Sequence, residues 1–122
     1  MDARLHEGID LFNQGKFFEC HEVLEPFYQE TDEQNKPFLE GLIQLAAAFR
    51  LHCDFGEIRG PVRMIYQALI RLENYQPDFL QIHVGELRQA AEAWAKAAEA
   101  GGAKPPAAAI LKIKLQRRGF FS

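Results

Sequence analysis

Apolar residues recur every three or four positions along most of the chain, which is the spacing of one face of a helix. Leu5, Ile9 and Phe12 follow this spacing after Asp2, a suitable N-cap, and Gly15 suits a helix end. They predict a first helix over about residues 3–14. No segment alternates convincingly between apolar and polar residues as a strand would.

A second helix is predicted from near Lys16. Pro26 lies inside it and removes the hydrogen bond to the carbonyl of Glu22, so we expect the helix to kink or end there and to resume through Phe27 and Tyr28. The polar residues 31–36 then predict a loop.

A third helix is predicted from Pro37, which suits a first helical turn. Its apolar residues occupy two sides, which is typical of a central, buried helix. Gly41 and Ala48 are small enough for a neighbouring backbone to approach closely. The two apolar sides are formed by Phe38, Leu42, Leu45 and Phe49 and by Ile43, Ala46 and Ala47.

The remaining elements are a fourth helix from Pro61 to near Asn74, an irregular connection over residues 75–82, and a fifth helix from about residue 83 to about residue 100. Gly101 and Gly102 end the fifth helix. The fold class is therefore all-α, a compact bundle of about five helices in antiparallel hairpins. The apolar residues of the C-terminal tail fit neither the helical nor the strand period, so its structure is left open; they are Ile110, Ile113 and Leu115.

Charge separates the chain into two parts. Residues 104–122 hold five of the 14 lysines and arginines and none of the 17 acidic residues, so they carry +5 against −8 for residues 1–103. We expect one helical domain over 1–103 and a basic, irregular tail over 104–122 that packs on the body or on a partner, a second copy or another protein. Five spread charges do not indicate nucleic-acid binding.

Location follows from what the sequence lacks. The N-terminus has no basic-then-apolar signal pattern, and the longest apolar stretch, residues 42–49, is too short to span a membrane. The expectation is a cytoplasmic protein without a membrane segment.

The candidate chemistry lies in the second and third helices. His21 and Glu25 are four residues apart and share a face that borders the buried side, with Glu22 next to His21. Glu40 and Gln44 share a face of the third helix in the same way. If the two helices pack antiparallel, these five residues converge in a buried polar network.

Two interpretations of this network remain open. A buried His/Glu/Gln network can fix the register of two helices, which makes the chain a structural or interaction module. Alternatively, His21, Glu22 and Glu25 bind a divalent metal or a small ligand, and the protein is a hydrolase. The duplicated Glu-x-x-His pattern of di-iron bundles and the His-Glu-x-x-His pattern are both absent, so whether the chain is an enzyme stays open.

Two resemblances bear on this choice. The turn at Gly15 resembles the turn of tetratricopeptide-type hairpins, which belong to peptide-binding repeats, although no second copy recurs at a period of about 34 residues. The run over residues 11–25, followed by residues 40–48, resembles the family called domain of unknown function 309, built on His-Glu-x-x-Glu and Gly-Leu-Ile-Gln segments.

The resemblance to that family covers about residues 5–75 and implies a small all-helical protein without an established activity, substrate or cofactor. It implies that His21, Glu22, Glu25, Gly41 and Gln44 are the characteristic positions. The chain departs from the family pattern at Pro26 and at Gly60-Pro61.

Overall fold

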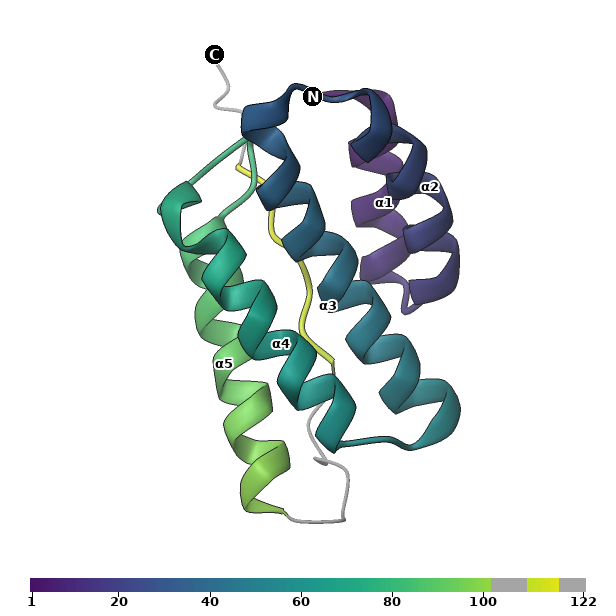
Figure 1. The fold of residues 1–122 in the computed structure, drawn as a ribbon, viewed down its shortest axis with the longest axis vertical. Helices are drawn as coiled ribbons and strands as arrows, with labels where there is room; N and C mark the ends of the chain where they lie inside the picture. The colour runs from purple at the N-terminus through teal and green to yellow at the C-terminus, as the bar shows by residue number, and fades with distance from the viewer. Residues whose placement is uncertain (102–109, 117–122) are drawn as a thin grey trace.

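The structure is a computed structural model that describes residues 1–101 and 110–116 (Figure 1). Over these residues the chain is all-α, as predicted, and contains no strand longer than a single bridge. Five α-helices are joined by short loops and two 3-10 turns. They are α1 (Ala3–Asn13), α2 (Phe17–Glu30), η1 (Glu33–Asn35), α3 (Lys36–Phe55), α4 (Arg59–Leu72), η2 (Glu73–Tyr75) and α5 (Val84–Ala100).

Most predicted helix boundaries hold to within two residues. Asp2 caps α1 as expected, because its Oδ1 atom accepts the N–H of Arg4 at 2.8 Å. Pro37 lies in the first turn of α3, and the helix ends at Gly56 in the left-handed conformation. The expected break at Pro26 is wrong: α2 runs unbroken from Phe17 to Glu30. Pro26 is exposed, so water can solvate the carbonyl that it leaves unpaired.

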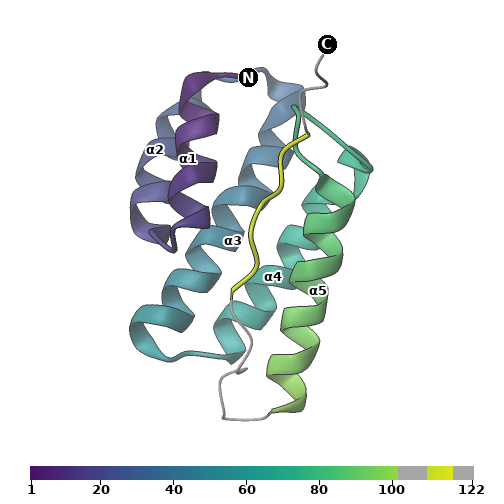
Figure 2. The same cartoon turned by 180° about the vertical axis from the view of Figure 1, so that it is seen from behind.

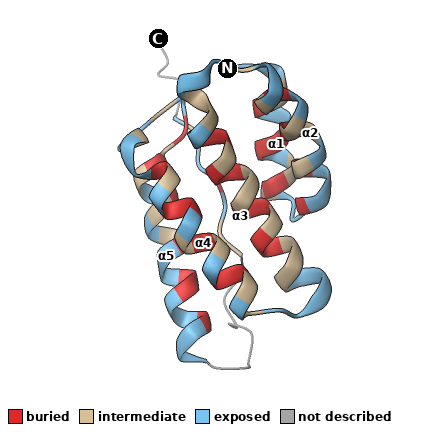
Figure 3. Cartoon of the chain, viewed as in Figure 1, coloured by how far each residue is buried: buried red, intermediate tan, exposed pale blue. Residues whose placement is uncertain are grey.

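Each helix packs mainly on its neighbours in the sequence, so α3 lies between the α1–α2 hairpin and the α4–α5 pair. Its buried residues lie on more than one side, which confirms that it is the central helix (Figure 3). Phe49 on α3 contacts Phe12 on α1 and Trp94 on α5, with ring centroids 5.9 Å and 5.1 Å apart. This line of aromatic rings joins three helices that are not adjacent in the chain.

Glycine allows close contact between helices that follow each other in the chain. A Cβ atom built on Gly8 of α1 would lie 2.6 Å from Leu24 of α2, and one on Gly41 of α3 would lie 2.8 Å from Leu72 of α4. Real Cβ contacts are essentially never that short. The leucine of one helix therefore packs directly on the backbone of the other, as the small residue at position 41 led us to expect.

A tight turn precedes α5. Phe79 and Ile82 exchange two backbone hydrogen bonds, of 3.0 Å and 2.8 Å, around Leu80 and Gln81. Both intervening residues have positive φ, 47° and 67°, which is uncommon outside glycine. The expected irregular connection over residues 75–82 thus contains a hairpin turn that holds a leucine and a glutamine in the left-handed region.

The C-terminal tail is described only over residues 110–116, which we call the strap; the rest of the predicted tail lies outside the described residues. The strap is extended and runs along α3 between α1 and α5 on the face turned to the viewer in Figure 2. Ile113 belongs to the main hydrophobic core and is 4% exposed. None of the helices described here is both long and apolar enough to cross a membrane.

Replacing Gly41 by alanine is expected to lower the free energy of unfolding by about 1–3 kcal/mol, because Leu72 must move away from the new methyl group. Urea unfolding followed by circular dichroism measures this. Gly60→Ala is the matched control, since its Cβ atom would lie 3.6 Å from its nearest neighbour in a helical segment. Equal stability of the Gly41→Ala and Gly60→Ala proteins would contradict the close-packing explanation.

Candidate functional site

The polar residues predicted on α2 are only partly brought together. His21 Nε2 lies 3.7 Å from Glu25 Oε2, one helical turn away, and the two side chains are 42% and 46% exposed. Glu22 is exposed, and its position is rotated by about 100° around the helix axis from that of His21, so it does not join this pair. His21 and Glu25 therefore form a surface pair on α2.

Glu40 of α3 is the centre of the hydrogen bonding between helices. Tyr28 of α2 donates its hydroxyl to Glu40 Oε1 at 2.6 Å, and Arg71 of α4 donates Nε–H to Glu40 Oε2 at 3.0 Å. Arg71 also donates to Gln44 Oε1 at 2.9 Å, and Gln44 donates to Gln67 at 3.0 Å. We call these five residues the polar strip; they tie α2, α3 and α4 together.

The polar strip differs from the predicted network in membership. Glu40 and Gln44 are in it, but their partner on α2 is Tyr28, one turn beyond Glu25. Arg71 of α4 completes the strip and lies 31 residues from Glu40 along the chain. No local pattern marks that pairing, because it depends on how α3 and α4 cross.

The expected burial of the network is wrong. Among residues 1–101 and 110–116, no polar or charged residue is buried. The side chains of Glu40 and Arg71 are 39% and 38% exposed, at the edge where α2, α3 and α4 meet the solvent. This position avoids the free energy of desolvating an ion pair, and apolar residues fill the core instead.

Hydrogen bonding sets the ionisation of the polar strip. The pKa of Glu40 is lowered, first by the hydrogen bond from Tyr28 and then by the one from Arg71. The pKa of Tyr28 is raised, mainly because its hydroxyl donates to the Glu40 carboxylate. Glu40 is thus held as a carboxylate with both oxygen atoms occupied, an arrangement suited to holding helices in place.

A candidate metal site has little geometric support in the part of the chain that the structure covers. No three His, Cys, Asp or Glu side chains gather there in a way that could hold a metal ion. His21 and Glu25 supply two ligands at most, and Glu22 is not aligned with them.

A different candidate site lies on the opposite face, where Asn13 binds the strap. The side-chain oxygen of Asn13 accepts the backbone N–H of Ile113 at 2.7 Å, and its side-chain nitrogen donates to the carbonyl of Ile113 at 2.9 Å. One amide thus satisfies both polar groups of a single residue, as a neighbouring β-strand would. Both hydrogen bonds go to backbone atoms of Ile113, so they do not depend on which side chain that residue carries.

The strap is also paired with the segment before α5. His83 donates its backbone N–H to the carbonyl of Lys114 at 2.9 Å, and Gln116 donates to the carbonyl of Gln81 at 2.7 Å. We call Asn13 and residues 81–83 the strap site. Burial alternates along the strap: Ile113 is buried, and its neighbours Lys112 and Lys114 are exposed.

Sequence reasoning missed the strap site. The signal that was available is the alternation of Leu111, Ile113 and Leu115 with Lys112, Lys114 and Gln116, which has the period of a strand. Judging Ile110 together with Ile113 and Leu115 obscured this pattern. Asn13 carried no signal, because an asparagine at the end of a helix is ordinary.

Comparison with known proteins adds a family match. The family described as domain of unknown function (DUF309) matches residues 5–64, which run from α1 into α4 and include all five predicted polar residues. This supports the resemblance drawn from the sequence. No curated protein matches the chain.

Stability at acid pH tests the polar strip. A carboxylate whose pKa is lowered by folding contributes stability above its ordinary pKa of 4.5, and this contribution is lost as the pH falls through the folded value. Glu40→Gln is expected to lower the Tm at neutral pH and to make the loss of Tm between roughly pH 5 and pH 3 smaller than in the wild type. Calorimetry measures both, with Glu22→Gln as the control at an exposed glutamate. An unchanged pH profile in Glu40→Gln would refute this role.

Proposed function

We propose that the protein is a protein-interaction module whose strap site holds an extended peptide segment. The proposal rests on geometry, because the family that matches residues 5–64 is described as a domain of unknown function (DUF309), which names no activity. The chain's own residues 110–116 are the resident occupant.

The observation that carries this proposal is the double hydrogen bond between Asn13 and the backbone of Ile113. Backbone pairing supplies affinity for any extended chain, and alternate side chains supply selectivity, which is the general mode of β-strand addition. The partner is therefore an extended segment with apolar residues at every second position. The same segment of a second copy of this chain fits that description, as does one from another protein.

The polar strip takes a supporting role in this proposal. Tyr28, Glu40 and Arg71 hold α2, α3 and α4 in register and so fix the position of α3, along which the strap runs. His21 and Glu25 form a separate surface pair on α2, and Glu22 is exposed beside it. The alternative of a metal-dependent hydrolase would need a third ligand beside His21 and Glu25, and no described residue provides one.

Peptide binding to an opened site tests the proposal. The Ile113→Glu substitution in the full chain places a charge at the buried position of the strap and should release it. A fluorescent peptide of residues 108–118 is then expected to bind this protein at least about tenfold more tightly than the wild type, whose tethered strap competes at high effective concentration. Fluorescence anisotropy measures both affinities, and circular dichroism checks that the helices persist.

Adding Asn13→Leu to the Ile113→Glu protein removes the amide at nearly constant size. Two hydrogen bonds of about 1 kcal/mol each correspond to a loss of affinity of roughly tenfold or more. Asn74→Leu, the same change at an exposed asparagine outside the strap site, is expected to leave the affinity unchanged. The proposal fails if the peptide binds the Ile113→Glu protein no better than the wild type, or if Asn13→Leu has no effect.

A further inference from the structure

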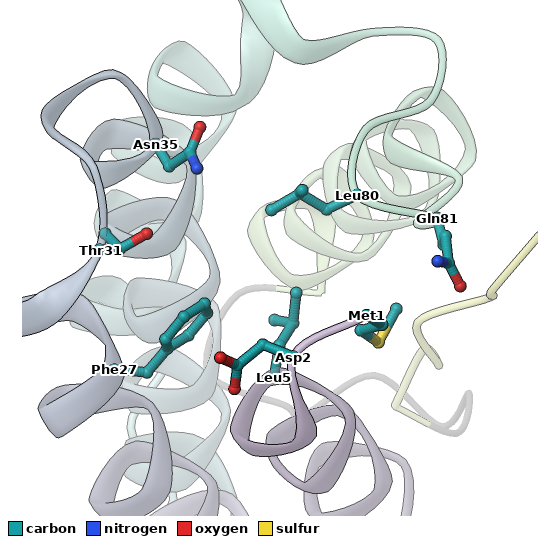
Figure 4. A pocket seen from close by; sticks show the side chains of 8 residues that line it. All are labelled: Met1, Asp2, Leu5, Phe27, Thr31, Asn35, Leu80 and Gln81. Atoms are coloured by element: carbon teal, nitrogen blue, oxygen red, sulfur yellow. The ribbon is translucent and has the colours of Figure 1, made fainter.

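A hollow lies beside the end of the strap, where the start of α1, the end of α2 and the tight turn before α5 meet (Figure 4). Leu5 and Phe27 are its buried apolar residues, and Leu80 extends into it from the turn. Its volume is about 320 Å³, at the lower end of the range for ligand pockets. The other residues that line it are Met1, Asp2, Thr31, Asn35 and Gln81.

The hollow exposes apolar surface that nothing covers among the described residues. Met1 and Leu80, both on its lining, are 39% and 37% exposed and are two of the few large apolar side chains that reach the solvent. A hollow of this size, with an apolar floor and a polar rim, fits one or two large side chains better than an extended ligand.

Gln81 connects the hollow to the strap. It lines the hollow, and its carbonyl accepts the backbone N–H of Gln116, the last described residue of the strap. The positive φ of Leu80 and Gln81 holds this turn in a conformation that few side chains adopt, and such conformations concentrate at binding sites. The described end of the strap therefore lies at the rim of the hollow.

Resting on the proposed function of the strap site, we infer that the hollow is the end pocket of that site and that it receives Phe120 and Phe121 of this chain. Phe120 follows Gln116 by four positions, and that length of extended chain can span about 13 Å, which is enough to cross the rim. Gly119 directly before the pair allows the chain to turn.

Composition favours this occupant over others. Two adjacent phenylalanines are costly to leave in water, and the apolar floor of the hollow removes that contact with water.

The two methionines provide a direct measurement. Met1 lines the hollow, whereas Met64 lies on α4 outside it, so methyl-labelled methionine yields one reporter signal and one internal control in the NMR spectrum of the full chain. The test compares the wild type with a protein that carries Phe120→Leu and Phe121→Leu. Phe55→Leu is the control, because Phe55 is 64% exposed and lies at the far end of α3.

If the phenylalanines occupy the hollow, the loss of their ring currents moves the Met1 signal and leaves Met64 in place, equally at low and high protein concentration. A Met1 signal that does not move, or that moves as much in Phe55→Leu, overturns the inference. A shift seen only at high concentration also overturns it, in favour of a second copy as the donor. The peptide assay of the strap site uses residues 108–118, which lack both phenylalanines, so the two proposals succeed or fail separately.

Discussion

The structure depends on the burial of α3, whose apolar residues lie on more than one side. Two hairpins whose helices pack mainly on their neighbours in the chain do not fully enclose such a helix, because α1 and α5 remain apart on one face. Hydrophobic burial therefore requires a further element there, and the strap supplies it with Ile113. The strap is thus part of the core through Ile113.

An extended strap needs hydrogen-bond partners for its backbone, whereas a sixth helix in the same place would not. A helix satisfies its own backbone, whereas an extended segment needs partners for its N–H and carbonyl groups wherever it is buried. Asn13 meets this demand on one edge and residues 81–83 meet it on the other. Such partners contact backbone groups and not side chains, and this feature is the basis of the proposed peptide-binding role.

The two faces of the molecule therefore use polar groups differently. On one face the polar strip joins side chains of three helices at the edge of the solvent, where Glu40 remains charged with little loss of hydration. On the other, a single asparagine amide and two backbone groups, the N–H of His83 and the carbonyl of Gln81, hold a chain segment. The first arrangement fixes positions within the body, and the second holds a segment that follows α5 in the chain.

Periodicity in the sequence determined the helices, the central place of α3 and the need for small residues such as Gly41, because these follow from local spacing and side-chain size. It also identified Glu40 and Gln44 as polar partners. Only the tertiary structure decided that Tyr28 and Arg71 complete the strip, that α2 passes Pro26 unbroken, and that Asn13 meets Ile113. Those contacts join residues 12 to 100 positions apart or depend on which side faces water, and neither quantity is encoded in local spacing.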